Sequence, residues 1–227
     1  MKLNESTAVS TAKVLLVPYE RRHVPKYHAW MEDPAIQEAT ASDRLTLEEE
    51  YENQGSWRAS HDKLTFIICQ PLSATDSQVS ITEGEADCEE KMIGDVNFFL
   101  HDGEDEEGFC VGEVDIMIAG VQDRGKGVGR AVVSSFLHYL QRNLDGVLTE
   151  YKTSRLGDNA ELPKLRQLVV KIKADNAASI ALFKSLGFTQ EGGVNYFGEI
   201  KLVLHDFEKV FAAAPEGYAE LIYSRRS

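Results

Sequence analysis

The sequence predicts an α/β protein of one domain, in which strand-like and helix-like segments follow one another along most of the chain. Two segments carry this prediction. Residues 113–118 read as a strand that runs through a glycine-rich turn into an amphipathic helix, and residues 168–173 read as a strand that runs into a helix opened by Asn176. A length of 227 residues fits one domain with a substantial core. We expect this domain to cover residues 1–205 and residues 206–227 to form a peripheral tail.

The N-terminal segment predicts a strand followed by a helix. Residues 14–17 are apolar and read as the strand. Pro25 is tolerated in the first turn of the helix, and Pro34 follows its end. One face of this helix is apolar and carries Val24, Tyr27 and Met31.

A capping box marks a second helix, because a threonine side chain and a glutamate three residues later can satisfy each other's backbone N–H groups. Thr46 and Glu49 have this spacing, and the helix is expected to extend towards Trp57. Strands are expected at residues 64–69, 92–100 and 109–118. The polar, acidic residues 71–90 predict a mobile loop.

The helix after the glycine-rich turn is strongly amphipathic. Its apolar side chains recur at helical spacing, which predicts one buried face. They are Val128, Val132, Val133, Phe136, Leu137 and Leu140. Residues 146–166 read as a polar insertion to which the sequence assigns no element, and residues 200–204 read as a closing strand.

The glycine-rich turn, residues 122–130, has the composition of a phosphate-binding loop. Glycines between a strand and a helix let backbone N–H groups approach an anion at the positive end of the helix dipole. A P-loop reading fails at Gly127, where a hydroxyl residue is required. A dinucleotide-binding reading fails at Arg130, where a third glycine is required. The remaining pattern is Arg-x-x-Gly-x-Gly, formed by Arg124, Gly127 and Gly129, and it resembles the acyl-CoA pyrophosphate loop of the GCN5-related N-acetyltransferases (GNAT superfamily).

A second segment resembles the other signature of the same superfamily. Asn176 suits a helix start, and Ile180 and Phe183 recur at helical spacing. Gly187 suits a left-handed helix end, followed by the apolar Phe188. The resemblance implies a mixed, strongly twisted sheet with helices on both faces, over roughly residues 14–204.

At finer grain the chain resembles one eukaryotic family, N-acetyltransferase nine, also called alpha/beta-tubulin N-acetyltransferase. The shared features are Met-Lys-Leu-Asn-Glu at residues 1–5, the Val-Pro-Tyr and His-Val-Pro-x-Tyr-His-x-Trp-Met stretches at 17–31, Gly-Asp-Val-Asn-x-Phe-Leu at 94–100, and Gly-Glu-Val-Asp-x-Met-Ile-Ala at 112–119. This resemblance implies transfer of an acetyl group from acetyl-CoA to a protein amine, with N-terminal α-amines favoured and tubulin as the expected partner.

The superfamily resemblance also implies which residues bind the cosubstrate, acetyl-CoA. Backbone N–H groups of the turn and its basic side chains contact the diphosphate. The pantetheine arm lies where two strands diverge, and a backbone N–H near Met117 and Ile118 stabilises the oxyanion, a contribution on the order of 3 kcal/mol. The expected cofactor-binding residues are Met117, Ile118, Arg124, Gly125, Lys126, Gly127, Val128, Gly129, Arg130, Asn176 and Phe183.

Two carboxylates and one tyrosine are candidates for proton transfer. Glu113 and Asp115 share one face of a strand. The resemblance implies a base at Glu113, acting directly or through water, and an ion pair at the strand end is the equally weighted alternative. Phe183 stands where many superfamily members carry a tyrosine that protonates the leaving thiolate. Water can supply that proton, with Tyr196 as a speculative substitute.

Composition excludes several classes of function. The net charge of −13 disfavours binding to nucleic acid. The three cysteines have no paired spacing and the six histidines no metal-ligand spacing, so we expect no disulfide framework, no metal, and a cytoplasmic or nuclear location.

No apolar run is long enough to span a membrane, and residues 1–6 lack a signal-peptide stretch. Two acidic clusters, at 83–90 and 102–107, read as solvated loops, and the second could attract a cationic substrate at the acceptor side.

Three functions stay open at this point. The favoured one is acetylation of a protein α-amine by direct attack of the neutral amine on the thioester. Acetylation of lysine or of a small cationic amine is the second, because acidic loops suit such substrates. The third is a non-catalytic module that binds CoA or associates with the cytoskeleton, which Phe183 in place of tyrosine would explain.

Overall fold

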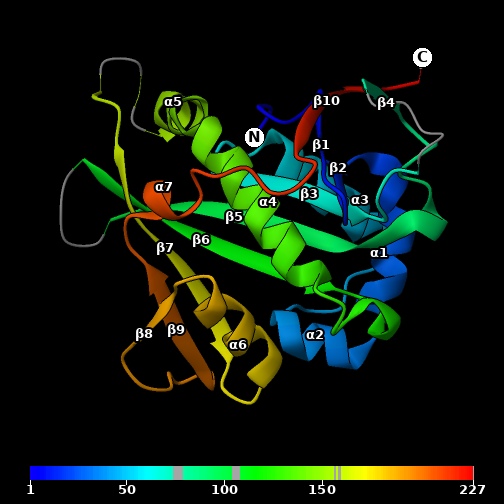
Figure 1. The fold of residues 1–227 in the computed structure, drawn as a ribbon. Coiled ribbons are helices and arrows are strands. Elements are labelled where there is room, and N and C mark those ends of the chain that lie inside the picture. Colours follow the sequence, from blue (N-terminus) through cyan, green and yellow to red (C-terminus); the bar gives the residue numbers. More distant parts are fainter. Residues whose placement is uncertain (74–78, 104–107, 156, 158–159, 227) are drawn as a thin grey trace.

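The computed structural model of the chain describes residues 1–73, 79–103, 108–155, 157 and 160–226. Its centre is one ten-stranded sheet with the strand order β4-β10-β1-β2-β3-β5-β6-β7-β9-β8 (Figure 1). The strands are β1 (Thr7–Ser10), β2 (Leu15–Pro18), β3 (Lys63–Cys69), β4 (Ser80–Thr82), β5 (Met92–Asp102), β6 (Phe109–Ile118), β7 (Lys164–Lys173), β8 (Thr189–Glu191), β9 (Glu199–Leu204) and β10 (Ala219–Ser224). The pairs β6–β7 and β10–β4 are parallel, and the other neighbours are antiparallel. The predicted mixed sheet is confirmed.

Helices cover both faces of this sheet, as the sequence predicts. The helices are α1 (Val24–Met31), α2 (Pro34–Thr40), α3 (Leu47–Ala59), α4 (Val128–Arg142), α5 (Leu144–Arg155), α6 (Ala177–Ser185) and α7 (Phe207–Val210), with short 3-10 turns at Arg21–His23, Glu89–Lys91 and Val121–Asp123. One core lies between the sheet and α4 to α7, and a second lies between the other face and α1 to α3. Figure 1 shows α4 crossing the face of the sheet.

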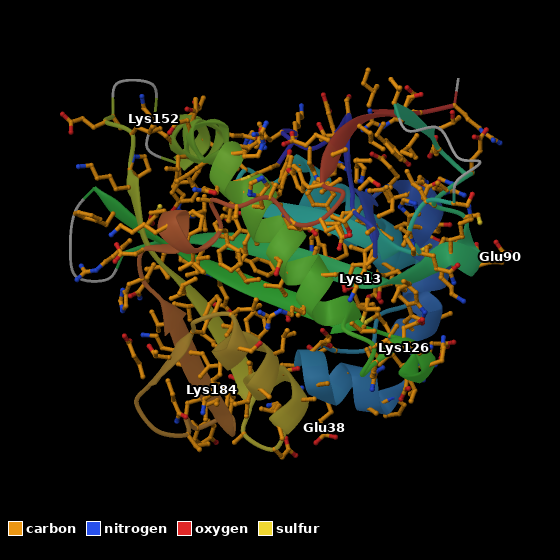
Figure 2. The ribbon with its side chains drawn as sticks, in the orientation of Figure 1. Lys13, Glu38, Glu90, Lys126, Lys152 and Lys184 are labelled. Atoms are coloured by element: carbon orange, nitrogen blue, oxygen red, sulfur yellow. The ribbon has the colours of Figure 1, made fainter. Side chains whose placement is uncertain are left out.

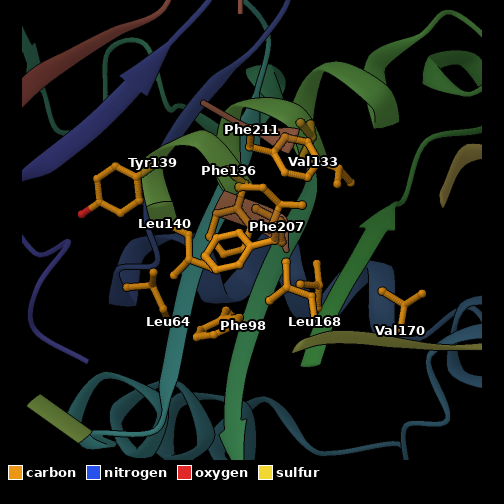
Figure 3. Close-up of a cluster of buried hydrophobic side chains, with 14 of the residues drawn as sticks. Leu64, Phe98, Val133, Phe136, Tyr139, Leu140, Leu168, Val170, Phe207 and Phe211 are labelled. Atoms are coloured by element: carbon orange, nitrogen blue, oxygen red, sulfur yellow. The ribbon is translucent and has the colours of Figure 1, made fainter. Parts of the chain in front are cut away.

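Strand alternation and helix periodicity build the first core. The apolar face predicted for α4 is buried, apart from the partly buried Val128, in one cluster with alternating residues of two strands, Leu64, Phe66 and Ile68 of β3 and Val96, Phe98 and Leu100 of β5. Phe66 packs edge-to-face against Phe136 and Tyr139, with ring centroids 6.0 and 5.3 Å apart. Figure 3 shows Phe207 and Phe211 in the same cluster, although they lie beyond the expected domain boundary. Helix α4 is thereby fixed at its buried face, which sets the direction of its first turn.

The first two helices confirm their sequence signals. Val24, Tyr27 and Met31 of α1 are buried together. In α3 the Thr46 hydroxyl accepts from the Glu49 N–H at 3.3 Å and the Glu49 carboxylate accepts from the Thr46 N–H at 2.8 Å, so the capping box forms. Helix α2 and strand β1 were not expected. Pro34 follows the end of α1 as expected, and it also opens α2 as its first residue.

The C-terminal tail is not peripheral, and the sequence-based prediction for residues 206–227 is wrong for the residues described. Strand β10 lies inside the sheet, between β1 and β4, and buries Leu221 and Tyr223. Helix α7 buries Phe207, and Phe211 follows it into the first core. A tail with alternating apolar residues completes the sheet because β1 otherwise leaves an unpaired edge.

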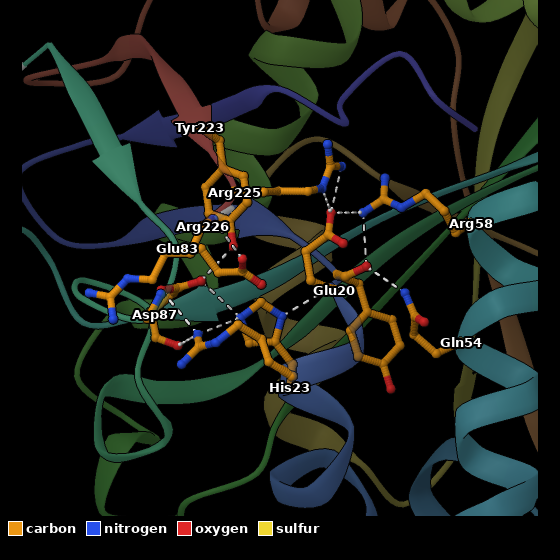
Figure 4. A network of polar contacts seen from close by, with 12 residues as sticks. Glu20, His23, Gln54, Arg58, Glu83, Asp87, Tyr223, Arg225 and Arg226 are labelled. Carbon is orange, nitrogen blue, oxygen red and sulfur yellow. Dashed lines mark hydrogen bonds and ion pairs between the residues drawn. The ribbon is translucent and has the colours of Figure 1, made fainter.

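The acidic segment 71–90 also differs from the predicted solvated loop. Residues 80–82 form β4, and the side chain of Asp87 is fully buried. Asp87 accepts from the Tyr223 hydroxyl at 2.7 Å and from Nε2 of His23 at 3.0 Å, and Arg22 lies 3.1 Å away (Figure 4). Residues 74–78 lie outside the described residues. A buried carboxylate therefore joins the β4–β5 connection, the start of α1 and the tail.

The polar insertion contains a helix. Helix α5 occupies residues 144–155 and buries Val147, Leu148 and Tyr151, so its apolar residues are core positions. Strand β7 begins at Lys164, within the segment to which no element was assigned. The insertion thus covers one end of the first core, away from the glycine-rich turn (Figure 1).

Candidate functional site

Strands β6 and β7 pair only over their first halves and then diverge. Their register runs from Phe109 opposite Lys164 to Glu113 opposite Val169. Beyond this point β6 continues to Ile118 beside β5, whereas β7 continues beside β9. The divergence expected from the sequence is therefore present.

Gly94 allows the backbone of β6 to lie unusually close to β5 at this point. A Cβ atom on Gly94 would lie 1.9 Å from the carbonyl oxygen of Met117, far inside van der Waals contact. The Ala119 N–H donates to the Ile93 carbonyl at 3.0 Å. Since backbone groups alternate along a strand, those of Met117 then face β5, and those of Ile116 and Ile118 face the side from which β7 has departed. Of the two predicted contacts, only the N–H of Ile118 is turned towards the divergence.

The glycine-rich turn adopts the backbone conformation that its composition predicts. Gly125 and Gly127 have φ of 73° and 79°, values that residues with a Cβ rarely adopt. Gly127 is the N-cap of α4 and Val128 its first residue, so N–H groups of Gly127, Val128 and Gly129 are at the positive end of the helix dipole. The turn is exposed, and its shape suits a diphosphate.

The three basic residues of the turn have different surroundings. Arg124 donates to the carbonyls of Ile118 and Ala119 at 2.9 and 3.1 Å, which ties the turn to the end of β6. Arg130 donates to the Ser185 hydroxyl at 2.6 Å and so joins α4 to α6. Lys126 is exposed. Of the three residues, Lys126 is the best placed to contact an anion, because Arg124 and Arg130 donate hydrogen bonds to protein groups and hold the turn in place.

A fourth basic residue lies beside the turn and was missed by the sequence analysis. The Lys13 ammonium lies 3.6 Å from the position that a Cβ on Gly127 would take, and Figure 2 shows Lys13 and Lys126 at the start of α4. Lys13 belongs to the connection between β1 and β2, which no sequence signal relates to residues 122–130. Four cationic side chains thus surround the first turn of α4 in a chain of strongly negative charge.

The second signature segment forms as predicted. The Asn176 side chain accepts from the Ser179 N–H at 3.1 Å and caps α6, and Gly187 has a φ of 95° beyond its end. Phe183 is buried and packs edge-to-face against Phe188 at 5.2 Å. Contacts of Asn176 and Phe183 with a bound ligand stay predictions. Gly129 of α4 packs against α6, since its Cβ would lie 3.2 Å from Leu182.

The two candidate carboxylates on β6 differ in their surroundings. Glu113 lies 2.7 Å from the Lys171 ammonium and 3.6 Å from His101 Nε2, at the last paired position of β6 and β7. This arrangement matches the ion pair that was the alternative to a catalytic role. Asp115 lies two residues further, where β7 has departed, and its side chain is exposed by surface area.

The environment of Asp115 nevertheless favours its neutral form. Desolvation by the dense protein around it, opposed by the Ile116 N–H and reinforced by the charge of Glu113, raises its pKa to about 6. The accessible surface of Asp115 indicates an exposed side chain, whereas the strong desolvation that raises its pKa indicates a buried one. Both hold if the carboxylate is open to solvent on one side only, and solvent access then limits the shift without reversing it. Asp115 is thus a carboxylate able to exchange a proton near neutral pH.

A second carboxylate, missed by the sequence analysis, lies behind Asp115. Asp95 of β5 is diagonal to Asp115 in the β5–β6 register, where Asn97 is opposite Asp115. Asp95 is 2% exposed and accepts from the Asn97 amide at 2.7 Å, while the Asn97 carbonyl accepts from the Thr65 hydroxyl at 2.7 Å. Desolvation and the charge of Asp115 raise the pKa of Asp95 to about 7. The signal in the sequence that could have pointed to Asp95 was an aspartate in the middle of a predicted strand, within the Gly-Asp-Val-Asn stretch.

Aromatic side chains from α1, α3 and the residue after β2 pack together on the same face of the sheet. Tyr19 contacts Tyr27 and Trp57, with ring centroids 5.3 and 6.1 Å apart. The Tyr19 hydroxyl is buried and has no hydrogen-bond partner within the part of the chain that the structure describes. Glu50 of α3 is also buried there, and burial raises its pKa. The α1–α3 side of β6 is therefore both acidic and aromatic.

Tyr196 and the second acidic cluster lie elsewhere. Tyr196 is 96% exposed in the connection between β8 and β9 and contacts Phe197, so it is not a core residue. Asp102 accepts from the Tyr151 hydroxyl and pairs with Arg155 at 3.2 Å, at the opposite end of β6 from Ile118. Residues 104–107 lie outside the described residues. Asp102 thus does not border the acceptor side as expected.

The described residues contain neither a cluster suited to a metal ion nor a helix that could cross a membrane. No group of three or more histidine, cysteine, aspartate or glutamate side chains in them is arranged to hold a metal ion. None of their helices has the length and apolar character to span a membrane. Cys69, Cys88 and Cys110 are free thiols.

Comparisons with known proteins agree with this geometry. The family model of the acetyltransferase (GNAT) domain matches residues 13–189. The chain is 42% identical over 202 residues to Alpha/beta-tubulin-N-acetyltransferase 9 of Drosophila melanogaster, covering 89% of this chain and 88% of that protein. It is 40% identical over 205 residues to the Homo sapiens protein of the same name, covering 90% and 86%.

Solved structures share the fold at lower identity. The ribosomal L7/L12 alpha-N-protein acetyltransferase in complex with coenzyme A is 15% identical with a TM-score of 0.57, covering 87% of this chain and 97% of that one. Spermidine N-acetyltransferase from Vibrio cholerae, in complex with CoA and spermine, is 15% identical with a TM-score of 0.58, covering 88% and 98%. Together with the glycine-rich turn and the divergent strands, these matches show that the chain is an acetyltransferase that uses acetyl-CoA and belongs to the N-acetyltransferase 9 family within the GNAT acetyltransferases.

Proposed function

We propose that this acetyltransferase acts on the α-amine of a protein N-terminus, with tubulin N-termini as the expected substrates. The relatives from Drosophila melanogaster and Homo sapiens are named for alpha/beta-tubulin, which supports a protein acceptor. A structural neighbour is named as an alpha-N-protein acetyltransferase, which supports compatibility of the fold with an α-amine. The chain and an acidic partner would repel each other at long range, so recognition has to come from local contacts.

The observation that carries the proposal is the position of Asp115, exposed at the divergence of β6 and β7 with a pKa raised to about 6. An α-amine has a pKa near ~8 and a lysine side chain near ~10.4. A carboxylate of this kind takes a proton more readily from an α-amine than from lysine, since the pKa of the α-amine is about 2.4 units lower. Asp115 is therefore matched to an α-amine.

Different residues of the chain serve different parts of the direct acetyl transfer. The turn at 125–129 holds the diphosphate, and Lys13 and Lys126 add positive charge. The Ile118 N–H faces the side where the acetyl oxygen gains negative charge. Asp115 takes a proton from the incoming ammonium. Phe183 has no phenol to offer the thiolate, so water protonates it.

The test is thiol release from acetyl-CoA by the purified protein. Peptides that match α- and β-tubulin N-termini should release thiol in proportion to acetylated peptide, and the same peptides with a blocked α-amine should not. Absence of release with either peptide, while calorimetry shows that CoA binds, would reject these substrates.

A second candidate substrate is a small cationic amine. The carboxylates of Asp95, Asp115 and Glu50 on the α1–α3 side would attract it, and a neighbour with the same fold is named as a spermidine N-acetyltransferase. A panel of polyamines against N-terminal peptides separates the two. A kcat/KM that is higher for polyamines would favour this candidate.

A further inference from the structure

Arg124 joins the glycine-rich turn to the last residue of β6. Its Nε donates to the Ile118 carbonyl at 2.9 Å, and its Nη2 donates to the Ala119 carbonyl at 3.1 Å. Two hydrogen bonds from one planar guanidinium fix the orientation of the group more strictly than a single bond does. The Arg124 side chain therefore holds together two parts of the candidate site that lie six positions apart in the sequence.

The Ile118 carbonyl is one of the backbone groups that β7 leaves without a strand partner. The N–H and C=O of an extended residue point to the same side of the strand, so both groups of Ile118 face the divergence of β6 and β7. The pairing of the two strands ends where Glu113 lies opposite Val169. A carbonyl shielded from water costs free energy when it has no partner, and Ile118 is half-buried. Arg124 therefore takes the place that a strand would hold at this carbonyl.

The turn needs such a contact because part of its backbone is easily deformed. Gly125 and Gly127 lie at positive φ, and glycine has the largest backbone freedom of all residues. Before them, residues 121–123 form a 3-10 turn, which is closed by hydrogen bonds of 3.0 and 3.2 Å from the N–H groups of Asp123 and Arg124. Arg124 thus stands between an ordered turn and two deformable residues, where a side-chain contact to β6 limits the movement of both.

We propose that Arg124 is a positioning residue for acetyl transfer, which fixes the diphosphate-binding turn relative to the Ile118 N–H. This inference rests on the proposed function, in which that N–H stabilises the oxyanion, but not on the choice of acceptor. CoA carries its diphosphate and its thioester at the two ends of one pantetheine arm, so the thioester is placed only as well as the turn is held. A displacement of about 1 Å at a reacting group can lower the rate about 10²-fold. Arg124 limits this displacement because its hydrogen bond ends on Ile118 itself.

The alternative is that Arg124 binds the diphosphate through its charge, as the family resemblance implies. A phosphate ligand needs free donors, whereas Nε and Nη2 of Arg124 are directed at protein carbonyls. The backbone N–H groups at the start of α4, together with Lys13 and Lys126, provide positive potential beside the turn. The two roles make opposite predictions for a substitution that keeps the charge of Arg124 and removes its paired hydrogen bonds.

Arg124→Lys is that substitution, because a lysine keeps the charge but cannot donate to both carbonyls from one plane. With an acceptor amine that the protein acetylates, kcat should fall about tenfold or more, because the acetyl group is placed less exactly. The dissociation constant of CoA, measured by calorimetry, should stay within about threefold, because the charge is kept. Arg124→Met should lower kcat to a similar extent. A wild-type kcat in Arg124→Lys, or a loss of CoA affinity with no loss of kcat at saturating acetyl-CoA, would overturn the proposal.

Arg142→Lys in the last turn of α4 is the matched control. Arg142 also donates through its Nε, to Glu220 at 2.8 Å, and it lies at the opposite end of the helix from the glycine-rich turn. This substitution should leave both kcat and the affinity for CoA unchanged. A fall in kcat equal to that of Arg124→Lys would mean that loss of any such arginine contact on α4 slows the reaction, which would contradict a specific role of Arg124.

A second measurement needs neither an acceptor nor turnover, and so separates this inference from the proposed function. Hydrogen exchange followed by NMR, without CoA, reports the backbone amides of residues 123 and 124. Both should exchange severalfold faster in Arg124→Lys and in Arg124→Met, while amides in the last turn of α4 stay unchanged. Unchanged exchange at residues 123 and 124 would refute the inference even if kcat falls. Faster exchange in a protein that acetylates no tubulin peptide would support the role of Arg124 and reject only the proposed substrate.

Discussion

The Lys171 ammonium lies 2.7 Å from the Glu113 carboxylate at the last paired position of β6 and β7. This ion pair separates two candidate bases that the sequence could not tell apart. Glu113→Gln should leave kcat/KM within the same order of magnitude, whereas Asp115→Asn should lower it by about 10²-fold or more, a usual loss for general-base catalysis. Steady-state kinetics of the two variants decide this, and the opposite ranking would assign the base to Glu113.

The contact between Gly94 and the Met117 carbonyl predicts a second outcome. Gly94→Ala should destabilise the protein and weaken CoA binding, because the 1.9 Å contact can be relieved only by a shift of β6. Gly193→Ala is the matched control, since a Cβ there meets nothing within 4 Å. Thermal unfolding and calorimetry with CoA measure both effects. Equal behaviour of the two variants would mean that β6 does not depend on Gly94.

Lys13 is expected to contribute to CoA binding through charge. Lys13→Ala should weaken CoA binding about fivefold at low salt, since an exposed ion pair contributes at most about 1 kcal/mol, and the loss should shrink as salt screens it. Lys152→Ala on α5 is the control, and Figure 2 shows Lys152 far from Lys13. A loss of affinity that is the same in both variants, or independent of salt, would argue against a direct phosphate contact.

The buried Asp87 predicts how stability depends on pH. Burial alone would raise its pKa, but hydrogen bonds from His23 and Tyr223 and the charge of Arg22 outweigh burial and lower it to about 2, against an ordinary 3.8. A depressed pKa stabilises the fold above about pH 4, and this stabilisation is lost as the pH falls through about 2. The difference corresponds to roughly 2 kcal/mol.

Asp87→Asn should therefore destabilise the protein by about 2 kcal/mol or more at pH 7 and at pH 4, and by less at pH 3. Urea unfolding at the three pH values measures this difference. Asp145→Asn, at an exposed position in the first turn of α5, is the control and should show no such trend. A destabilisation by Asp87→Asn that stays the same down to pH 3 would show that the ionised carboxylate is not what holds the tail to α1.

The sequence predicted the elements whose signal is local. Helix α4 was recognised from apolar residues at helical spacing, and α6 from its Asn176 cap and Gly187 end. Strand β10 was missed because its partners β1 and β4 lie far away in the sequence, and six residues give a short alternation. Helix α5 was missed because polar residues flank its three core positions.

The site was predicted to a similar extent. The glycine-rich turn follows from composition, because positive φ requires glycine at Gly125 and Gly127. The position of Asp95, diagonal to Asp115, could not be read from its stretch, because it follows from the β5–β6 register. Lys13 likewise reaches the turn only through the arrangement of the sheet and α4.

The most direct test of the account is a competition within one peptide. A peptide with a tubulin N-terminal sequence, a free α-amine and one internal lysine is incubated with the protein and acetyl-CoA, and tandem mass spectrometry locates the acetyl group. We expect it on the α-nitrogen, with the lysine unmodified at early times. Acetylation of the lysine alone, or of neither amine by a protein that binds CoA, would contradict the account.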